Sequence, residues 1–232
     1  MEITKIDHIK LSDGHTYTGY GYYGNGEFIP HGVGKKFYDG YDVWGNYEHG
    51  KVNGPAINNH HSYMYASNFV NNRANGWGLS MNRGILTQFG YYKNSELKTD
   101  LTDMVEWFYE KVIKFWDDHK SGMATVITNR MTLKLHELLI GWSYKVLSPG
   151  CTRHQMGFHF MLDGTLWVGV TDKFDMTGTL MKFQNDGHIV IGKFQKGELV
   201  EPISFNDWFL SYTSMPPKIN FKFDPNKNYF ED

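Results

Sequence analysis

A repeat of about 22 residues is the feature of this sequence that most restricts its fold. When the chain is shifted by 22 residues against itself, segment 46–54 (NYEHGKVNG) aligns with segment 68–76 (NFVNNRANG), with three identical residues. Small residues also fall into register at this shift: Gly32, Gly54 and Gly76, and two positions later Gly34, Ala56 and Gly78. Such a fixed period indicates a stack of similar units, each of which buries its apolar face against its neighbours.

The residues of each unit are typical of a β-hairpin. Asp39-Gly40 maps two units on to Arg83-Gly84, and an Asp-Gly pair suits the positive backbone dihedral angles of a tight turn. Aromatic residues make up 16% of the chain and glycine contributes 25 residues, a mixture that favours short twisted strands over a helical bundle. A single hairpin is marginally stable in water, so stacking must supply the stability.

The same pattern returns later in the chain. Two Asp-Gly pairs are 23 residues apart, as are two single glycines: Asp163-Gly164 and Asp186-Gly187, and Gly169 and Gly192. Agreement in two separate regions predicts two sets of hairpins. We therefore divide the chain into a hairpin array at 1–98, a helix at 99–122, a second β-region at 123–215 in which the repeat resumes at 163–199, and an extended tail at 216–232.

Residues 102–119 form the one clear helical pattern. Apolar residues recur there at steps of three, four and three, which predicts an amphipathic helix whose apolar face packs on the β-array: Val105, Phe108, Val112 and Phe115. Two short segments stay ambiguous. Residues 136–140 fit either a strand or a helix, and so do residues 207–210.

Several of these motifs resemble the MORN (membrane occupation and recognition nexus) repeat family, whose units open with Tyr-x-Gly and contain Gly-x-Gly before an apolar residue. The matching segments are Tyr17-Thr18-Gly19, residues 32–37 (GVGKKF) and Asp39-Gly40, whereas Ala66 follows Tyr65 in a later unit. The resemblance implies a mainly β fold, namely an antiparallel β-hairpin array in a single-layer twisted sheet, and an accessory role. With the patterns above, we expect one amphipathic helix and a second β-region beside it.

Charge and cysteine content restrict the class of protein. Lys plus Arg is 23 and Asp plus Glu is 25, so the formal charge of −2 provides no broad basic face for nucleic acid. The single cysteine, Cys151, excludes an internal disulfide framework and suits a reducing compartment. No run of 18 apolar residues is present, so we expect a cytoplasmic protein without a membrane span.

Catalytic and metal-binding patterns are incomplete. Cys151, His154 and His159 resemble a fragment of a site, but the two histidines differ by an odd count and face opposite sides of one strand. The adjacent pair His60-His61 has the same difficulty, so we predict neither a metal nor a cofactor. Residues 19–24 formally read G-x-G-x-x-G, but no helix is expected to follow, as a dinucleotide site requires.

A hairpin array displays regular rows of side chains, and exposed aromatic residues could contact a ligand. The candidates are Tyr22, Tyr23, Tyr41, Trp44, Tyr63, Tyr65 and Trp77. For any one of them, stacking between units is the favoured role. The preferred hypothesis is a non-enzymatic scaffold that binds another protein. The alternatives are a carbohydrate-binding or hydrolytic protein with an aromatic-lined groove, and a peripheral protein that binds anionic lipid through Lys35-Lys36.

Overall fold

The computed structural model describes residues 2–83, 85–119, 124–129, 134–145, 153–172 and 176–212. The chain divides into two compact units. The first contains residues 1–100, 126–138 and 161–164, and the second contains residues 101–125, 139–160 and 165–232. Both are mainly β-structure, as the sequence predicts.

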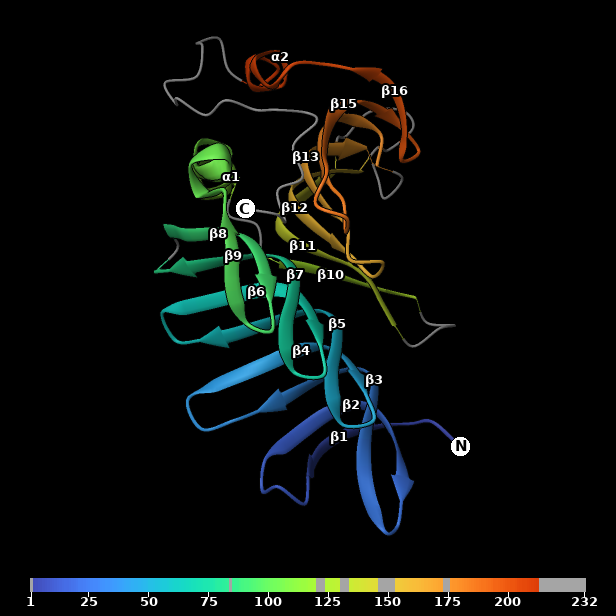
Figure 1. Cartoon of the computed structure of the whole chain (residues 1–232). Coiled ribbons are helices and arrows are strands. Elements are labelled where there is room, and N and C mark those ends of the chain that lie inside the picture. The colour runs from blue at the N-terminus through green and yellow to red at the C-terminus, as the bar shows by residue number, and fades with distance from the viewer. Residues whose placement is uncertain are drawn as a thin grey trace. The chain divides into compact units, whose positions relative to one another are not determined.

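The first sheet is an antiparallel meander of nine strands in chain order (Figure 1). Every strand pairs with the next one along the chain, so the sheet is a row of consecutive hairpins, and the predicted fold class is confirmed. Its strands are β1 (Thr4–Lys10), β2 (Thr16–Gly24), β3 (Glu27–Phe37), β4 (Tyr41–Glu48), β5 (Lys51–His60), β6 (Tyr63–Val70), β7 (Arg73–Asn82), β8 (Ile85–Lys93) and β9 (Glu96–Asp100).

Two-residue turns join the strands at one end of this sheet. Both residues of each turn have positive φ, the geometry that matches the right-handed twist of the flanking strands. The turns are Asn25-Gly26, His49-Gly50, Asn71-Asn72 and Asn94-Ser95. Asp39-Gly40 also lies in a turn, as predicted, but at the opposite end, where only Gly40 has positive φ and the Tyr38 N–H donates to Tyr41 O.

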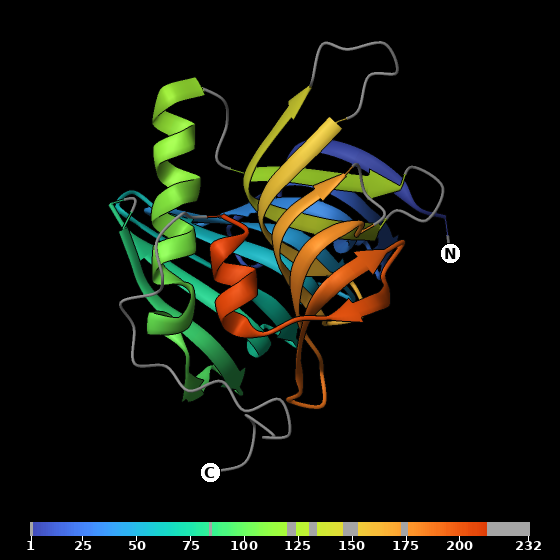
Figure 2. The same ribbon diagram turned by 90° about the horizontal axis from the view of Figure 1, so that it is seen from above.

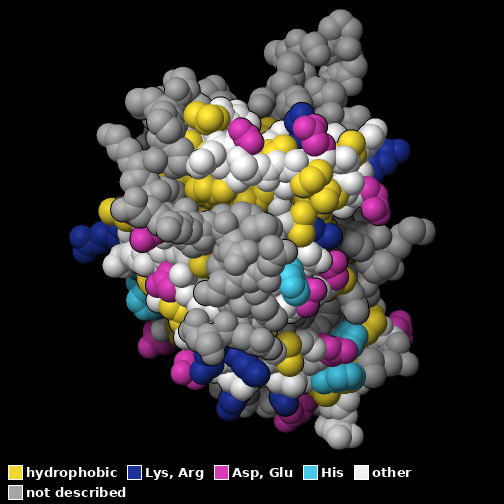
Figure 3. Space-filling view, turned by 45° about the horizontal axis from the view of Figure 1, so that its top comes forward, with side chains coloured by type: hydrophobic (Ala, Val, Ile, Leu, Met, Phe, Trp, Pro, Cys, Tyr) yellow, Lys and Arg dark blue, Asp and Glu magenta, His cyan; other side chains and the backbone are white. Residues whose placement is uncertain are grey.

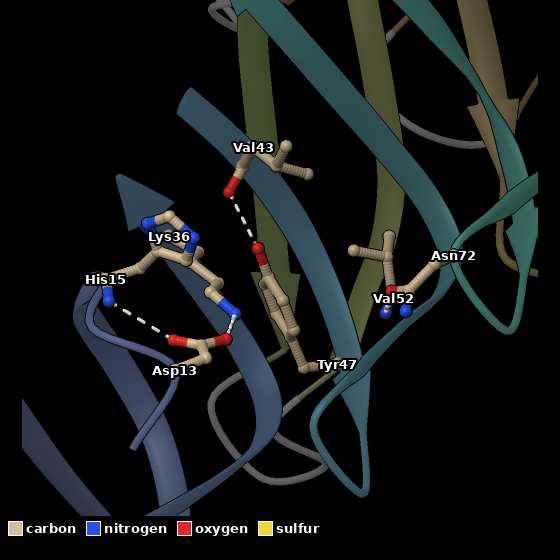
Figure 4. A network of polar contacts seen from close by, with 7 residues as sticks. All are labelled: Asp13, His15, Lys36, Val43, Tyr47, Val52 and Asn72. Carbon is tan, nitrogen blue, oxygen red and sulfur yellow. Dashed lines mark hydrogen bonds and ion pairs between the residues drawn. The ribbon is translucent and has the colours of Figure 1, made fainter. Parts of the chain in front are cut away.

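Each two-residue turn after the first is bonded to the preceding hairpin, through what we call the turn clasp. The N–H of the second turn residue donates to a carbonyl 20 or 21 residues earlier, at 2.8, 3.0 and 2.8 Å; the pairs are Gly50 to Pro30, Asn72 to Val52, and Ser95 to Ala74. The Asn72 clasp is reciprocal, because its Oδ1 accepts from the Val52 N–H at 2.7 Å (Figure 4). These bonds lock successive hairpins together.

The two glycines of the Gly-x-Gly motif have different roles. The first lies in a β-bulge, where three residues of one strand face a single residue of its partner, and it has φ of 98–126° in Gly32, Gly54 and Gly76. The second belongs to a row of small residues that pair from strand to strand: Gly19, Gly34, Gly45, Ala56, Ser67, Gly78 and Gly90.

This small-residue row makes room for aromatic rings that lie on the sheet. A Cβ on Gly34 would stand 1.9 Å from the Tyr17 hydroxyl, so the phenol occupies that space. Tyr17 meets Tyr47 edge-on at 5.3 Å between ring centroids, and Tyr65 meets Tyr92 at 5.2 Å. The sheet thereby buries one face under its own side chains, as stacking predicts.

The second sheet has seven strands, again in chain order. They are β10 (Ala124–Asn129), β11 (Lys134–Lys145), β12 (Arg153–Met161), β13 (Leu166–Asp172), β14 (Gly178–Phe183), β15 (Ile189–Gln195) and β16 (Glu198–Pro202). Asp163-Gly164 and Asp186-Gly187 lie in hairpin turns, as predicted. Glycines also pair from strand to strand here, Gly157 with Gly169, but Leu180 lies between Gly169 and Gly192. Residues 136–140 lie in β11, so the helical alternative for them is wrong.

Two helices belong to the second unit, α1 (Thr102–His119) and α2 (Phe205–Leu210), and they lie side by side (Figure 2). Trp107 of α1 contacts Phe209 of α2 at 4.1 Å between ring centroids. Phe108 meets Phe158 of β12 edge-on at 5.9 Å. Of the predicted apolar face, Val105 and Phe108 are fully buried in the second unit, and the side chains of Val112 and Phe115 lie outside the described residues.

Candidate ligand-binding surface

A continuous line of aromatic and histidine rings crosses one end of the first sheet. Tyr38 and Tyr41 are parallel and stacked at 4.5 Å between centroids, and His15 lies against Tyr38 at 4.5 Å. His60 follows Tyr41 at 6.4 Å, and its edge meets His61 at 5.6 Å. We name these five residues the ring strip: His15, Tyr38, Tyr41, His60 and His61. Three successive turns contribute to it.

An ion pair between the buried Lys36 and the exposed Asp13 fixes the first part of the ring strip (Figure 4). The Lys36 ammonium, on a side chain 9% exposed, pairs with Asp13 Oδ2 and also lies 5.2 Å from the Tyr38 ring centroid. The other carboxylate oxygen of Asp13 accepts from the His15 N–H at 3.2 Å. The ion pair therefore joins the turn between β1 and β2 to β3, and it holds the rings of His15 and Tyr38 in place.

The pKa values around this ion pair follow from burial and hydrogen bonding. Burial by itself would raise the pKa of Asp13, but hydrogen bonds from Lys36 and the His15 N–H, with the Lys36 charge, bring it below its ordinary value. Burial raises the pKa of Tyr38, and the Lys36 charge opposes the rise. Asp13 therefore stays ionised and Tyr38 stays neutral at physiological pH.

A second ring cluster lies near the two-residue turns at the opposite end of the strands. It consists of Tyr22, His31 and His49, whose ring centroids are 5.2–6.1 Å apart. The Tyr22 hydroxyl and His49 Nδ1 are 2.9 Å apart and share a hydrogen bond. The cluster ties β2 and β3 to the following turn, so packing between hairpins accounts for its geometry.

The seven predicted aromatic residues have diverse environments. Tyr41 lies in the ring strip, and Tyr63 is 41% exposed opposite His60 in the neighbouring strand. Tyr22 belongs to the second cluster, and Tyr23 is the most exposed of the seven at 62%. Trp44 is half-buried. The structure thus brings two of the seven to one end of the array and places the others elsewhere.

Tyr65 and Trp77 face the protein interior. Tyr65 is half-buried and packs against the array's own core beside Phe69 and Tyr92. Trp77 is fully buried and stacks on Phe89 at 6.3 Å, so its prediction as an exposed binding residue is wrong. The bulge at Gly76 alters the alternation of β7 just before Trp77, and a period-two reading of the sequence does not include that bulge.

Sequence reasoning missed His15 and Tyr38. Both residues flank turns, and Tyr38 is 22 residues before His60, one repeat apart. That spacing was a usable signal, since residues one repeat apart lie side by side in a stacked array. The geometry of His60 and His61 also differs from the prediction: His61 lies in the turn after β5, so the two rings meet instead of pointing apart.

The other predicted motifs give no assembled site. Residues 19–24 lie in β2 and lead into a turn and β3, as expected for a hairpin. His159 is fully buried in β12, which also contains His154, while Cys151 lies outside the described residues. Among the described side chains, no group of three or more His, Cys, Asp or Glu is arranged to hold a metal ion.

The basic pair Lys35-Lys36 is engaged within the protein. Lys36 pairs with Asp13, and the Lys35 ammonium lies 3.0 Å from Asp42. On the face seen in Figure 3, acidic and basic side chains are interspersed over the described surface. In the described part of the chain, neither helix combines the length and apolar character of a membrane span.

Comparison with known proteins adds no assignment to this geometry. The sequence matches no protein-family model and no curated protein.

Proposed function

We propose that this chain is a non-enzymatic protein-interaction module and that the ring strip contacts its partner. The supporting observation is the continuity of the strip, in which neighbouring ring centroids are 4.5–6.4 Å apart and an ion pair of the buried Lys36 with Asp13 anchors one end. Tyrosine is enriched at protein interfaces, because its ring buries a large area and its hydroxyl keeps a polar contact. Side chains already held in place lose little conformational entropy on binding.

The geometry favours a protein over a sugar as the ligand. A sugar ring binds to an aromatic side chain by lying on its open face, and the Tyr38 ring already contacts His15, Tyr41 and the Lys36 ammonium. Binding to anionic lipid would require unpaired cations, and both Lys35 and Lys36 are in ion pairs. Ring edges, hydroxyls and imidazole nitrogens suit the mixed polar and apolar surface of a protein.

The repeat itself supports a MORN-like assignment as part of this proposal. Its glycines occupy bulges and the small-residue row, which are positions set by hairpin stacking. We propose a cytoplasmic setting for the module, because the single cysteine of the sequence suits a reducing compartment.

The test is site-specific photo-crosslinking in the cells that make the protein. A photoreactive amino acid replaces His61 in the ring strip, and in a control it replaces Glu96, an exposed residue at the other end of the strands. We expect one protein to be crosslinked from position 61 and not from position 96. The purified partner should then bind the double variant His60→Ser/His61→Ser about tenfold or more weakly.

The control for binding is His188→Ser, which changes a histidine in a turn of the second sheet. It should bind the partner with unchanged affinity. Equal crosslinking from positions 61 and 96, or equal affinity of the double variant and the parent protein, would contradict the proposal.

A further inference from the structure

The hairpin repeat leaves two of its own contacts incomplete, and they are complementary. Each turn clasp has its donor in the second turn residue. The acceptor lies two residues after the preceding turn in Asn72 to Val52 and Ser95 to Ala74, and four residues after it in Gly50 to Pro30. Gly26, the second residue of the first turn, makes no such bond within the described residues. The last hairpin of the second sheet has its turn at Lys196-Gly197. Leu199 lies two residues after that turn, as Val52 lies two residues after the turn His49-Gly50, so the Leu199 carbonyl is the equivalent acceptor.

Two rows of apolar side chains are also incomplete at these two hairpins. The first row consists of the aromatic residue two positions before each two-residue turn. In the first hairpin this residue, Tyr23, is 62% exposed. Its equivalents in the later hairpins are buried: Tyr47 is 3% exposed, Phe69 9% and Tyr92 5%. The second row consists of the residue three positions after the first residue of each turn. Phe28, Val52 and Ala74 hold this position and are buried. Its counterpart in the last hairpin, Leu199, is 44% exposed beside Val200 at 65%.

We propose that the β2–β3 turn of one molecule docks on the β15–β16 hairpin of a second copy. In this contact the Gly26 N–H donates to Leu199 O, and the Tyr23 ring covers Leu199 and Val200. The contact reproduces between two turns the bond and the apolar row that join hairpins inside the array, while β1 keeps its place beside β2. Each half is a fragment of an established contact of this chain, which identifies the occupant as a second copy.

The charges at the two turns are compatible with this contact. Glu27 is exposed directly after the first turn, and Lys196 is exposed in the last one. On the β15–β16 hairpin, Glu201 is already paired with Lys193 at 2.7 Å. The outer strands of the array are less suitable. β1 has a bulge with His8 at positive φ, and β9 is short and has charged residues at alternate exposed positions.

Because the two surfaces differ, the contact is heterologous. Each molecule has one donor surface at Tyr23 and one acceptor surface at Val200, so association produces linear chains or a closed ring. A single hairpin contact is small, which predicts weak association that depends on concentration.

The experiment is sedimentation equilibrium over concentrations from about 10 µM to about 1 mM. The parent protein should associate, whereas Tyr23→Ser and Val200→Ser should each remain monomeric. The matched control is Ile85→Ser, which removes an apolar side chain that is 66% exposed elsewhere in the array, and it should associate like the parent. Circular dichroism confirms that each variant is folded, and Tyr23→Lys replaces Tyr23→Ser if that variant is not.

A mixture of the two variants gives the decisive result. Tyr23→Ser keeps its acceptor surface and Val200→Ser keeps its donor surface, so an equimolar mixture should form dimers and nothing larger. A parent protein that is monomeric at about 1 mM would overturn the proposal. A mixture that stays monomeric, or an Ile85→Ser variant that also loses association, would overturn it too.

Discussion

Gly34 and Tyr17 illustrate how single residues determine this fold. The Tyr17 phenol lies on the sheet over Gly34, its hydroxyl donates to Tyr20 O at 2.8 Å, and the side chain is fully buried. The ring fits there only because position 34 has no side chain. The sequence shows a glycine in register with others, and the structure shows which ring needs the space.

We predict that Gly34→Ala destabilises the protein by about 2–3 kcal/mol, because the new methyl group would overlap the packed Tyr17 ring. The measurement is the free energy of unfolding in urea. Gly24→Ala is the matched control, since its Cβ would meet the end of the flexible Ile29 side chain at 3.0 Å and the Tyr22 ring at an ordinary contact distance of 3.4 Å. The control should change stability by less than about 1 kcal/mol. Equal effects of the two substitutions would refute the role assigned to Gly34.

At the scale of elements, the turn clasp explains why the hairpins repeat at a nearly fixed length. A donor in one turn must reach a carbonyl of the preceding hairpin, and Gly50, Asn72 and Ser95 do so over 20 or 21 residues. Inserting a residue into one strand would displace the donor from the acceptor. The period found in the sequence is therefore the length of chain that returns a turn to its neighbour.

Asn72 makes two bonds to Val52 and has φ of 69°. Replacing it with glycine keeps the backbone geometry but removes the acceptor of the Val52 N–H, so we expect a loss of about 1 kcal/mol. Asn72→Ala should lose about 2 kcal/mol, because alanine is also strained in the left-handed region. Thermal and urea denaturation would measure both.

Asn71→Gly is the control for this pair. Asn71 lies in the same turn with φ of 51°, and glycine adopts that conformation without strain. Its effect should stay within about 0.5 kcal/mol. If Asn72→Gly is as stable as Asn71→Gly, the side-chain half of the clasp contributes nothing.

At the scale of the whole molecule, buried tyrosines are distributed through both units. Burial raises the pKa of Tyr17, Tyr47 and Tyr65 in the array and of Tyr212 after α2. It raises the pKa of Tyr92 to about 12. The Tyr212 hydroxyl accepts from the Val170 N–H at 3.0 Å and donates to Thr179 O at 2.6 Å, which joins the chain after α2 to the second sheet.

These raised pKa values predict alkaline unfolding. A group with a raised folded-state pKa contributes stability that is fully present below its unfolded value, near 10 for tyrosine, and that is lost as the pH rises toward the folded value. We therefore expect the free energy of unfolding to fall from about pH 10 toward pH 12. Phenolate absorbance and circular dichroism, recorded together, would check this.

The order of ionisation and unfolding provides the internal check. The buried tyrosines should ionise together with the loss of β-structure. If all the phenolates formed while the circular dichroism was still native, the assigned burial would be wrong.

Several features of the fold could be predicted from local patterns. The array of hairpins, the helix that begins at Thr102, and the turns at Asp163-Gly164 and Asp186-Gly187 follow from periodicity and turn chemistry. Trp77 could not be placed correctly, because a bulge shifts the alternation of its strand. The strand at 136–140 was ambiguous for the same reason that short apolar runs usually are, namely that they fit both periods.

The sequence by itself determined that this chain stacks hairpins of about 22 residues, since glycine and aromatic positions repeat at the length of one unit. Only the tertiary structure decided which aromatic rings are buried and which form a surface. A ring's environment depends on the neighbouring hairpin that covers it, and that neighbour lies some 20 residues away along the chain. Tyr23 and Tyr47 have equivalent places in their own hairpins, yet one is exposed and the other buried. The difference is the presence of a preceding hairpin, which a local pattern does not encode.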